Sequence, residues 1–146
     1  MTTLAPYDED YVPARVKQIL MDELSTSIAT FRDLDNPANV RQPRTGGPYV
    51  EVEFPGDGLN RDEWGDFGNN AWEAEGTFQA HVFILRTEDM VVARRVMTEV
   101  VKLFAGRLVD NVHFRGALTP FVDAAGDGLF RGISRSIEYR YEFSNR

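Results

Sequence analysis

The chain has 146 residues, a formal net charge of −7 and no cysteine. This length predicts one domain with its own core, and the missing cysteines exclude disulfides, thiolate metal sites and cysteine nucleophiles. The acidic balance argues against general nucleic-acid binding, and no apolar run is long enough to span a bilayer. Since the opening residues also lack the basic and apolar regions of a signal peptide, we expect a soluble, cytosolic product.

Residues 1–9 form a predicted mobile acidic arm, and an amphipathic helix follows it. Asp10 is placed to cap this helix, and Pro13 is tolerated because the N–H groups of a first turn have no partner within the helix. A short strand is expected over residues 28–34, and it ends at Asp35-Asn36-Pro37 because the residue before a proline avoids helix. The apolar residues at helical spacing are Val12, Val16, Ile19, Leu20, Leu24 and Ile28.

A second strand is predicted from Tyr49 to Phe54, after a loop from Asn39 to Gly47 that contains Arg41 and Arg44. Apolar and polar residues alternate along this strand, which is typical of a strand with one face on a core and the other in water. The inward residues are Val50, Val52 and Phe54, and the outward ones are Glu51 and Glu53.

A glycine-rich acidic segment from Asp57 to Asn70 follows, and we expect it to be a long loop. Loops of this length in a compact domain are usually functional or disordered. Its Trp64 and Phe67 have two interpretations: they fold back on the sheet, or they anchor a partner, since aromatic residues are enriched at the energetic centres of interfaces. A calcium-binding loop is discounted because the acids lack the spacing of an EF-hand. The acids beside the aromatics are Asp62, Glu63 and Asp66.

The longest regular pattern runs from Ala71 to Gly106 and predicts a long strand followed by an amphipathic helix. Thr87 is expected to cap the helix, with Glu88 and Asp89 in its first turn, and Gly106 to end it. One face of the strand carries Trp72, Ala74, Phe78, Ala80, Val82 and Ile84, and the other carries Glu73, Glu75, Thr77, Gln79 and His81 until Phe83 and Leu85 make both faces apolar. The helix stripe is Ala93, Val96, Met97, Val100, Val101, Phe104 and Leu108.

Two closing strands, His113 to Val122 and Phe130 to Phe143, are predicted to form a hairpin around Gly126-Asp127-Gly128. In the second strand Ile133, Ile137, Tyr139, Tyr141 and Phe143 point one way, with Arg135 as the exception. The elements together predict one α+β domain over residues 1–146. Its expected architecture is a single-layer, mostly antiparallel sheet of four to five strands with two helices packed on one face.

Chemical motifs are almost absent, and we predict no enzyme, no catalytic residue, no cofactor and no metal. His81 and His113, with Asp123 or Glu75, could form a metal site only if their strands pair, and their spacing gives no support for one. Four carboxylates could line up across adjacent strands as an acid/base pair, because like charges held close raise one pKa. We favour the alternative, a solvated or ring-lining sheet face. These carboxylates are Glu51, Glu53, Glu73 and Glu75.

The order of elements resembles that of the tail-terminator proteins of long-tailed bacteriophages, the minor tail protein U kind, which also occur in gene transfer agents. The resemblance covers about Val12 to Phe143 and has no signature motif. It rests on an amphipathic helix, a strand ending in Asp35-Asn36-Pro37, the strand PYVEVEF, a long loop, the strand EGTFQAHVFIL, a helix ending in LFAGR and a closing hairpin with SIEYRYEF.

This resemblance implies a virion subunit that assembles in the host cytoplasm into a hexameric ring at the head-proximal end of the tail tube. Such a ring stops tube elongation and joins the tail to a head-closure protein, and DNA crosses its lumen without specific binding. An acidic protein suits this channel because carboxylates repel phosphate. The expected contacts with the tube protein or a neighbouring subunit are Trp64, Phe67, Asp62, Glu63 and Asp66, and then Arg41 and Arg44.

Two other interpretations stay open. Another phage neck component, such as a head-closure or tail-completion protein, has a similar size and composition. A small ligand-binding protein or enzyme would instead use the neighbourhood of His81, His113, Glu73 and Glu75.

Overall fold

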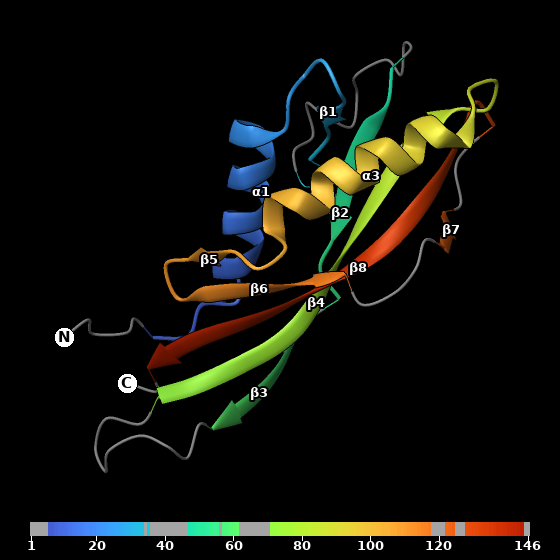
Figure 1. The fold of residues 1–146 in the computed structure, drawn as a ribbon. Coiled ribbons are helices and arrows are strands. Elements are labelled where there is room, and N and C mark those ends of the chain that lie inside the picture. The colour runs from blue at the N-terminus through green and yellow to red at the C-terminus, as the bar shows by residue number, and fades with distance from the viewer. Residues whose placement is uncertain are drawn as a thin grey trace.

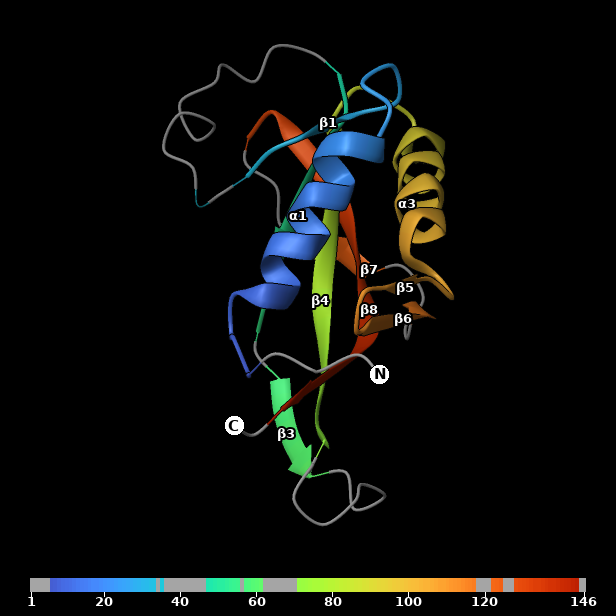
Figure 2. The same cartoon turned by 90° about the vertical axis from the view of Figure 1, so that its left-hand side faces the viewer.

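The computed structural model describes residues 6–33, 35, 47–55, 57–61, 71–117, 122–124 and 128–144. One sheet forms the body of the protein, and both helices lie on the same face of it (Figures 1 and 2). The helices are α1 (Tyr11–Glu23) and α3 (Met90–Phe104). The strands are β1 (Thr30–Phe31), β2 (Tyr49–Glu53), β3 (Asp57–Arg61), β4 (Ala71–Leu85), β5 (Leu108–Val109), β6 (Val112–Ala117), β7 (Val122–Ala124) and β8 (Phe130–Ser144).

The sheet has eight strands in the described part of the chain, in the order β1-β2-β4-β8-β6-β5, with β3 added to β4 and β7 added to β8. Every pair is antiparallel except β1 with β2, which is parallel. The α+β class, the mostly antiparallel sheet and the single helical layer are confirmed. The expected four to five strands are too few, because β3, β5 and β7 are short and lack a clear alternating pattern, whereas β1 lies within the strand predicted over residues 28–34.

The two longest strands, β4 and β8, hold the sheet together. Each has 15 residues, and they pair along their whole length, from Ala71 opposite Ser144 to Leu85 opposite Phe130. Their lower ends in Figure 1 extend with β3 beyond the layer of helices. The protein therefore has a covered end, where Leu85 leads into α3, and a projecting end, where β4 begins at Ala71.

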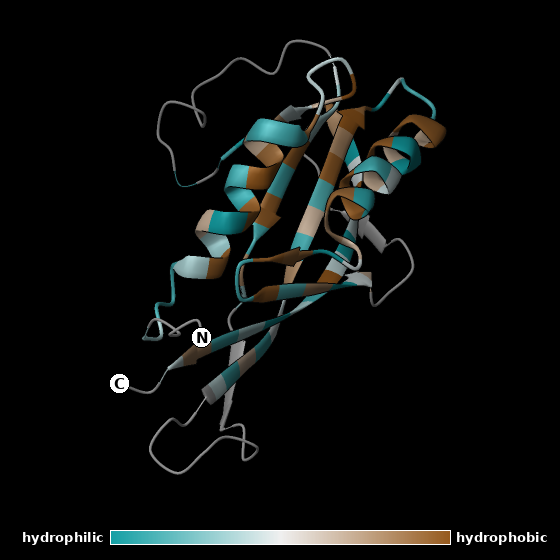
Figure 3. Cartoon of the chain, turned by 60° about the vertical axis from the view of Figure 1, so that its left-hand side comes forward, coloured by the Kyte–Doolittle hydropathy of each residue, from teal (hydrophilic) through white to brown (hydrophobic). Residues whose placement is uncertain are grey.

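The core lies between the sheet and the two helices, and its centre is a group of three aromatic rings. Phe78 of β4, Phe104 of α3 and Phe114 of β6 are fully buried, and their ring centroids lie 5.0 to 6.1 Å apart in edge-to-face arrangements. The predicted inward faces of β4, β8 and α3 supply most of the remaining core. Figure 3 shows the same division on α1, whose hydrophobic residues turn toward the sheet.

The first residues of α3 differ from the prediction. The N-cap is Asp89, whose side chain accepts a hydrogen bond of 3.0 Å from the backbone N–H of Val91, so the expected Thr87 cap is wrong. Gly106, with a φ of +71°, follows the helix as expected, since this left-handed conformation is easiest for glycine. Leu108 lies in β5 and is 69% exposed, so it does not extend the helix stripe.

The position of this cap leads to a simple test. We expect Asp89→Ala to lower the free energy of unfolding by about 1 kcal/mol, because an N–H of the first turn then loses its acceptor. Thr87→Ala should change it by less than about 0.5 kcal/mol, as is usual for surface substitutions without a specific partner. Urea denaturation of the two variants measures both values, and the reverse ranking would restore Thr87 as the cap.

Three further segments differ from the sequence predictions. Residues 57–61, expected as the start of a loop, form β3 along one edge of β4. The expected strand over 113–122 is two strands, β6 and β7, that pair with different parts of β8. Within the predicted arm, Pro6 forms a bridge with Ser144, and the Tyr7 ring lies 4.8 Å from that of Phe143. Asp10 does occupy the N-cap position of α1, but its side chain makes no capping hydrogen bond.

Candidate interaction surface

The predicted interface residues all lie outside the described part of the chain. These residues are Trp64, Phe67, Asp62, Glu63, Asp66, Arg41 and Arg44. The structure does place the ends of both segments. The acidic aromatic segment, residues 62–67, leaves from Arg61 at the end of β3 and returns to Ala71 at the start of β4, so both of its connections are at the projecting end. The arginine-containing segment connects Asp35 to Gly47.

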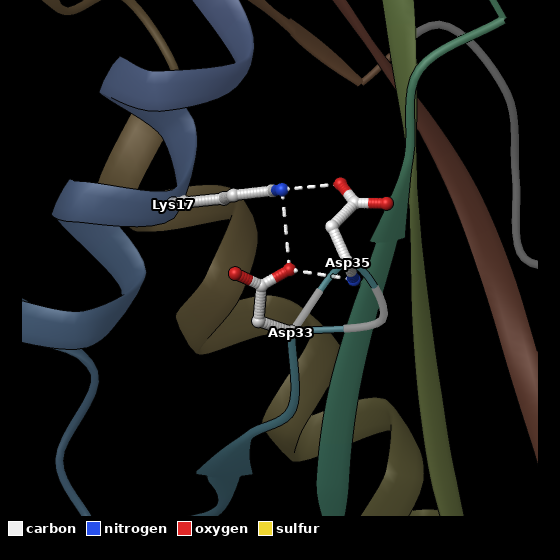
Figure 4. Close-up of polar contacts among 3 residues, drawn as sticks. All are labelled: Lys17, Asp33 and Asp35. Atoms are coloured by element: carbon white, nitrogen blue, oxygen red, sulfur yellow. Dashed lines mark hydrogen bonds and ion pairs between the residues drawn. The ribbon is translucent and has the colours of Figure 1, made fainter. Parts of the chain in front are cut away.

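Lys17 of α1 fixes the chain where the arginine-containing segment begins (Figure 4). Its Nζ lies 3.1 Å from Oδ1 of Asp33 and 2.5 Å from Oδ2 of Asp35. The same carboxylate of Asp33 accepts a hydrogen bond of 3.0 Å from the backbone N–H of Asp35. Burial lowers the pKa of Lys17, but the two carboxylates outweigh it and leave the pKa raised. The lysine is therefore charged at neutral pH and ties α1 to the end of β1.

The face of the sheet opposite the helices carries the four carboxylates that the sequence placed on the outward side. They do not gather: Glu51 and Glu53 of β2 lie opposite His81 and Gln79, whereas Glu73 and Glu75 lie further along β4 toward the projecting end. Three of them lie beside a basic side chain. Glu51 lies 3.4 Å from Arg32, Glu53 lies 3.2 Å from His81, and Glu73 forms an ion pair with Arg140. The hypothesis of an acid/base pair across adjacent strands is therefore wrong.

A close pair of carboxylates does occur within one strand. Burial raises the pKa of Glu73, and a hydrogen bond shared with Glu75 raises it further, while Arg140 opposes both effects. Glu73 is buried and Glu75 is exposed. This is the mechanism expected from the sequence, because two like charges held close favour the protonated form of one of them.

This pair predicts a pH dependence that can be measured. Glu75→Gln should lower the pKa of Glu73, because the neighbouring charge is removed and an amide N–H can donate to the carboxylate. In the parent protein the native state holds this proton to a higher pH than the unfolded chain does. The contribution of Glu73 to stability therefore decreases as pH rises from about 4.5 to its raised pKa.

Carboxyl carbon NMR titration of Glu73 measures the shift directly. Glu138→Gln is the matched control, since Glu138 lies on the same face but pairs with Arg115 and not with Glu73. An unchanged Glu73 pKa in Glu75→Gln would contradict the proposed cause.

The two histidines do not form a site together. His81 lies opposite Ser134 and His113 opposite Arg140, on strands that flank β8 from its two sides. The six positions between these partners correspond to about 20 Å along a strand. His81 instead shares a 2.5 Å hydrogen bond with the hydroxyl of Ser134. In the residues that the structure describes, no three histidine or acidic side chains are placed to hold a metal ion.

Two features were not predicted from the sequence, a second buried aromatic cluster and a groove. At the covered end, Tyr49, Phe83 and Phe130 form a second small cluster on the sheet face away from the helices, with ring centroids 5.0 and 5.1 Å apart around Tyr49. The apolar far end of β4 was its sequence signal. The other feature is a shallow groove of about 570 Å³ beside α3, here called the α3 groove. It is lined by Ile28, Val91, Val92, Arg94, Arg95, Val96, Thr98 and Glu99.

The α3 groove combines an apolar floor with two cations. Val96 is buried, and Val91 is 40% exposed although it is a large apolar residue. Arg94 and Arg95 are exposed, and no ion pair to either guanidinium is seen within the described ranges. Glu99, the acid of the groove, is 3.4 Å from Lys102. The sequence signal was weak: Val91 is an apolar residue off the stripe of α3, and Ile28 was assigned to the stripe of the first helix although it lies in the turn after α1.

Among the described helices, neither α1 nor α3 is long and apolar enough to cross a membrane. The geometry thus defines an open-faced α+β sheet with charged side chains on one face and an apolar groove beside α3.

Comparisons with known proteins find similar folds among solved structures but no similar sequence. No known protein family and no curated protein matches the sequence. A chain of the virion of a native gene transfer agent particle is similar in structure, with a TM-score of 0.58 and 16% identity over 87% of this chain and 91% of that one. A second solved protein, whose name carries no functional description, has a TM-score of 0.57 and 22% identity over 93% and 96% of the two chains. At these identities the comparisons establish a shared fold.

Proposed function

We propose that this protein is a structural subunit of a phage-like particle. The observation that carries the proposal is the similarity to a chain of a gene transfer agent virion across nearly the whole length of both chains. The open sheet, on which Glu51 and Glu73 pair with arginines and not with each other across strands, fits a scaffold better than a reaction centre.

Within that class, we propose a tail terminator that forms a ring at the head-proximal end of the tail tube. The order of elements in the sequence supports this role, and the fold supplies surfaces that a ring needs. A ring of identical subunits requires two different complementary patches on each subunit. Strand β5 is one end of the sheet, β3 adds a further edge at the projecting end, and unpaired strand edges favour pairing with another chain.

The polar sheet face is suited to a channel that DNA crosses. Its exposed carboxylates include Glu53 and Glu75, and the whole protein has a net charge of −7. Negative charge on a lumen repels phosphate and so prevents DNA from adhering during passage. In this proposal the partners are further copies of the chain, the tail tube protein and a head-closure protein.

Reconstitution with tail tubes tests this function. The protein would be mixed with tubes of the tube protein encoded in the same gene cluster and imaged by negative stain or cryo-electron microscopy. We expect one ring at a single end of each tube and an arrest of further tube growth. A protein that stays monomeric with tubes present, or that binds along their sides, would refute the terminator role. A twelve-fold ring on the head vertex would indicate another neck component.

A further inference from the structure

We propose that the α3 groove of one subunit binds the acidic aromatic segment, residues 62–67, of a second copy of this chain. The inference extends the proposed ring and rests on it only in requiring that copies of the chain associate. It specifies a head-to-tail contact in which the α3 groove of one copy meets residues 62–67 of the next. The segment has the sequence Asp62-Glu63-Trp64-Gly65-Asp66-Phe67.

The chemistry of the two surfaces is complementary. The groove offers Arg94 and Arg95 as cations at the edge of an apolar floor, and the segment offers three carboxylates around two aromatic residues. Glu99, the acid of the groove, repels the carboxylates of the segment only weakly, because its own carboxylate lies near the Lys102 ammonium group. Aromatic anchors in an apolar pocket with charges at the rim are typical of the energetic centre of an interface. The groove volume of about 570 Å³ lies in the range of sites that bind drug-sized groups.

Geometry excludes binding within one chain. The segment is attached at Arg61 and Ala71, at the projecting end, whereas α3 follows Leu85 at the covered end (Figures 1 and 2). A strand of 15 residues such as β4 spans about 46 Å from the projecting end to the covered end. Helix α3 starts at the covered end, and its groove residues, Val91 to Glu99, extend along only about 12 Å of helix axis.

The attachments of the segment set how far its aromatic residues can extend. Trp64 is three residues from Arg61, so its backbone lies within about 11 Å of that residue. Phe67 is four residues from Ala71 and lies within about 15 Å of it. Neither reach spans the distance to the groove of the same molecule, so the complementary surfaces meet only between two molecules.

Such a contact is heterologous, because each copy uses its projecting end on one neighbour and its groove on the other. Contacts of this type produce a closed ring when the rotation between subunits returns to the start. The inference therefore accounts for why the segment is acidic and aromatic, and for why an apolar groove with two arginines remains open on the outside of α3.

Disulfide cross-linking between engineered cysteines tests the contact directly, because the chain has no cysteine of its own. The full-length variant Gly65→Cys/Thr98→Cys keeps all charges and aromatic residues and puts one thiol on each surface. Under mild oxidation with tubes present, we expect a non-reducing gel to show a ladder of linked chains up to the size of the ring. Gly65→Cys/Leu108→Cys is the control, since Leu108 is also exposed but lies outside the groove, and this variant should stay monomeric. Ladders of equal strength from both variants, or none from the first, would overturn the proposal.

Charge exchange gives a second, independent readout. Arg94→Glu/Arg95→Glu and Asp62→Lys/Glu63→Lys should each fold but lose ring formation, and all four changes in one chain should restore it. Mixing the two double variants should restore rings in which they alternate, because every contact between unlike copies then joins a groove and a segment of opposite charge.

The outcomes separate this inference from the proposed function. Rings that form on tubes despite the groove changes would refute the inference and leave the terminator role in place. Linked rings that never bind a tube end would refute the terminator role and leave the contact in place. Groove variants that fail on tubes without any ladder in the first variant would identify the tube protein as the occupant, and so overturn the inference.

Discussion

Phe78→Ala should lower the free energy of unfolding by about 3 to 5 kcal/mol, the largest effect expected from any single substitution in this protein. Phe78 is fully buried in the middle of β4 and contacts elements far apart in the sequence. Its ring centroid lies 5.0 Å from that of Phe104 in α3 and 6.1 Å from that of Phe114 in β6. Truncation removes both contacts and leaves a cavity that three different elements would have to move to fill.

Urea or thermal denaturation of the purified chain measures this effect, and a loss of this size corresponds to a fall in Tm on the order of 10 °C. Leu129→Ala is a suitable control, because Leu129 is 68% exposed and its truncation should change the free energy of unfolding by less than about 0.5 kcal/mol. If Phe78→Ala costs less than about 1 kcal/mol, the three-ring group is not the centre of the core.

Gly132→Ala is the second substitution expected to have a large effect, although it adds only one methyl group. Gly132 lies in β8 opposite Phe83 of β4. A Cβ at this position would overlap the carbonyl oxygen of Val82 and lie 2.8 Å from Cδ1 of Phe83. The clash involves backbone as well as a packed ring, so rotation of one side chain does not relieve it. We expect a destabilisation of about 1 to 3 kcal/mol, as for other overpacked positions.

The control for this variant is Gly116→Ala in β6, where an added Cβ meets nothing within 4 Å. Replacing glycine by alanine reduces the conformational freedom of the unfolded chain, which alone favours the alanine form by about 0.4 to 1 kcal/mol. Gly116→Ala should therefore be neutral or slightly stabilising under the same denaturation conditions, and equal stabilities of the two variants would contradict the clash.

Strong periodicity explains which parts of the fold were predictable from sequence. The 15 residues of β4 alternate so clearly that both of its ends and both of its faces were predicted. The stripe of α3 and its end at Gly106 are confirmed for the same reason. Both elements bury a continuous apolar face, which is the property that a sequence pattern records most directly.

Short elements without an alternating pattern, and the choice between two possible helix caps, could not be predicted. Strand β3 has the sequence Asp57-Gly58-Leu59-Asn60-Arg61, with no β-branched residue, and it forms because β4 continues past the helices and leaves an edge to pair with. The cap of α3 was misplaced because Thr87 and Asp89 are both good N-cap residues, and only the path of the turn after Leu85 selects between them.

The candidate surfaces depend on tertiary structure to an even greater degree. The outward carboxylates of β2 and β4 were identified, but their cations come from other elements: Arg32 follows β1, and Arg140 belongs to β8. The α3 groove needs Ile28 from the turn after α1 beside the outer face of α3, a neighbourhood that no local pattern encodes. The predicted contacts at Trp64, Phe67, Arg41 and Arg44 lie outside the described residues and stay predictions.

The pairing of β4 with β8 has a consequence for how the polypeptide reaches its native state. All of α3, β5, β6 and β7 lie between the two strands in the sequence, so their alignment requires closure of a long loop. Chains dominated by such non-local pairing fold in milliseconds to seconds, whereas local helical proteins fold much faster. We therefore expect α3 to form early and the two long strands to align from the Leu85–Phe130 end, where the intervening loop is shortest.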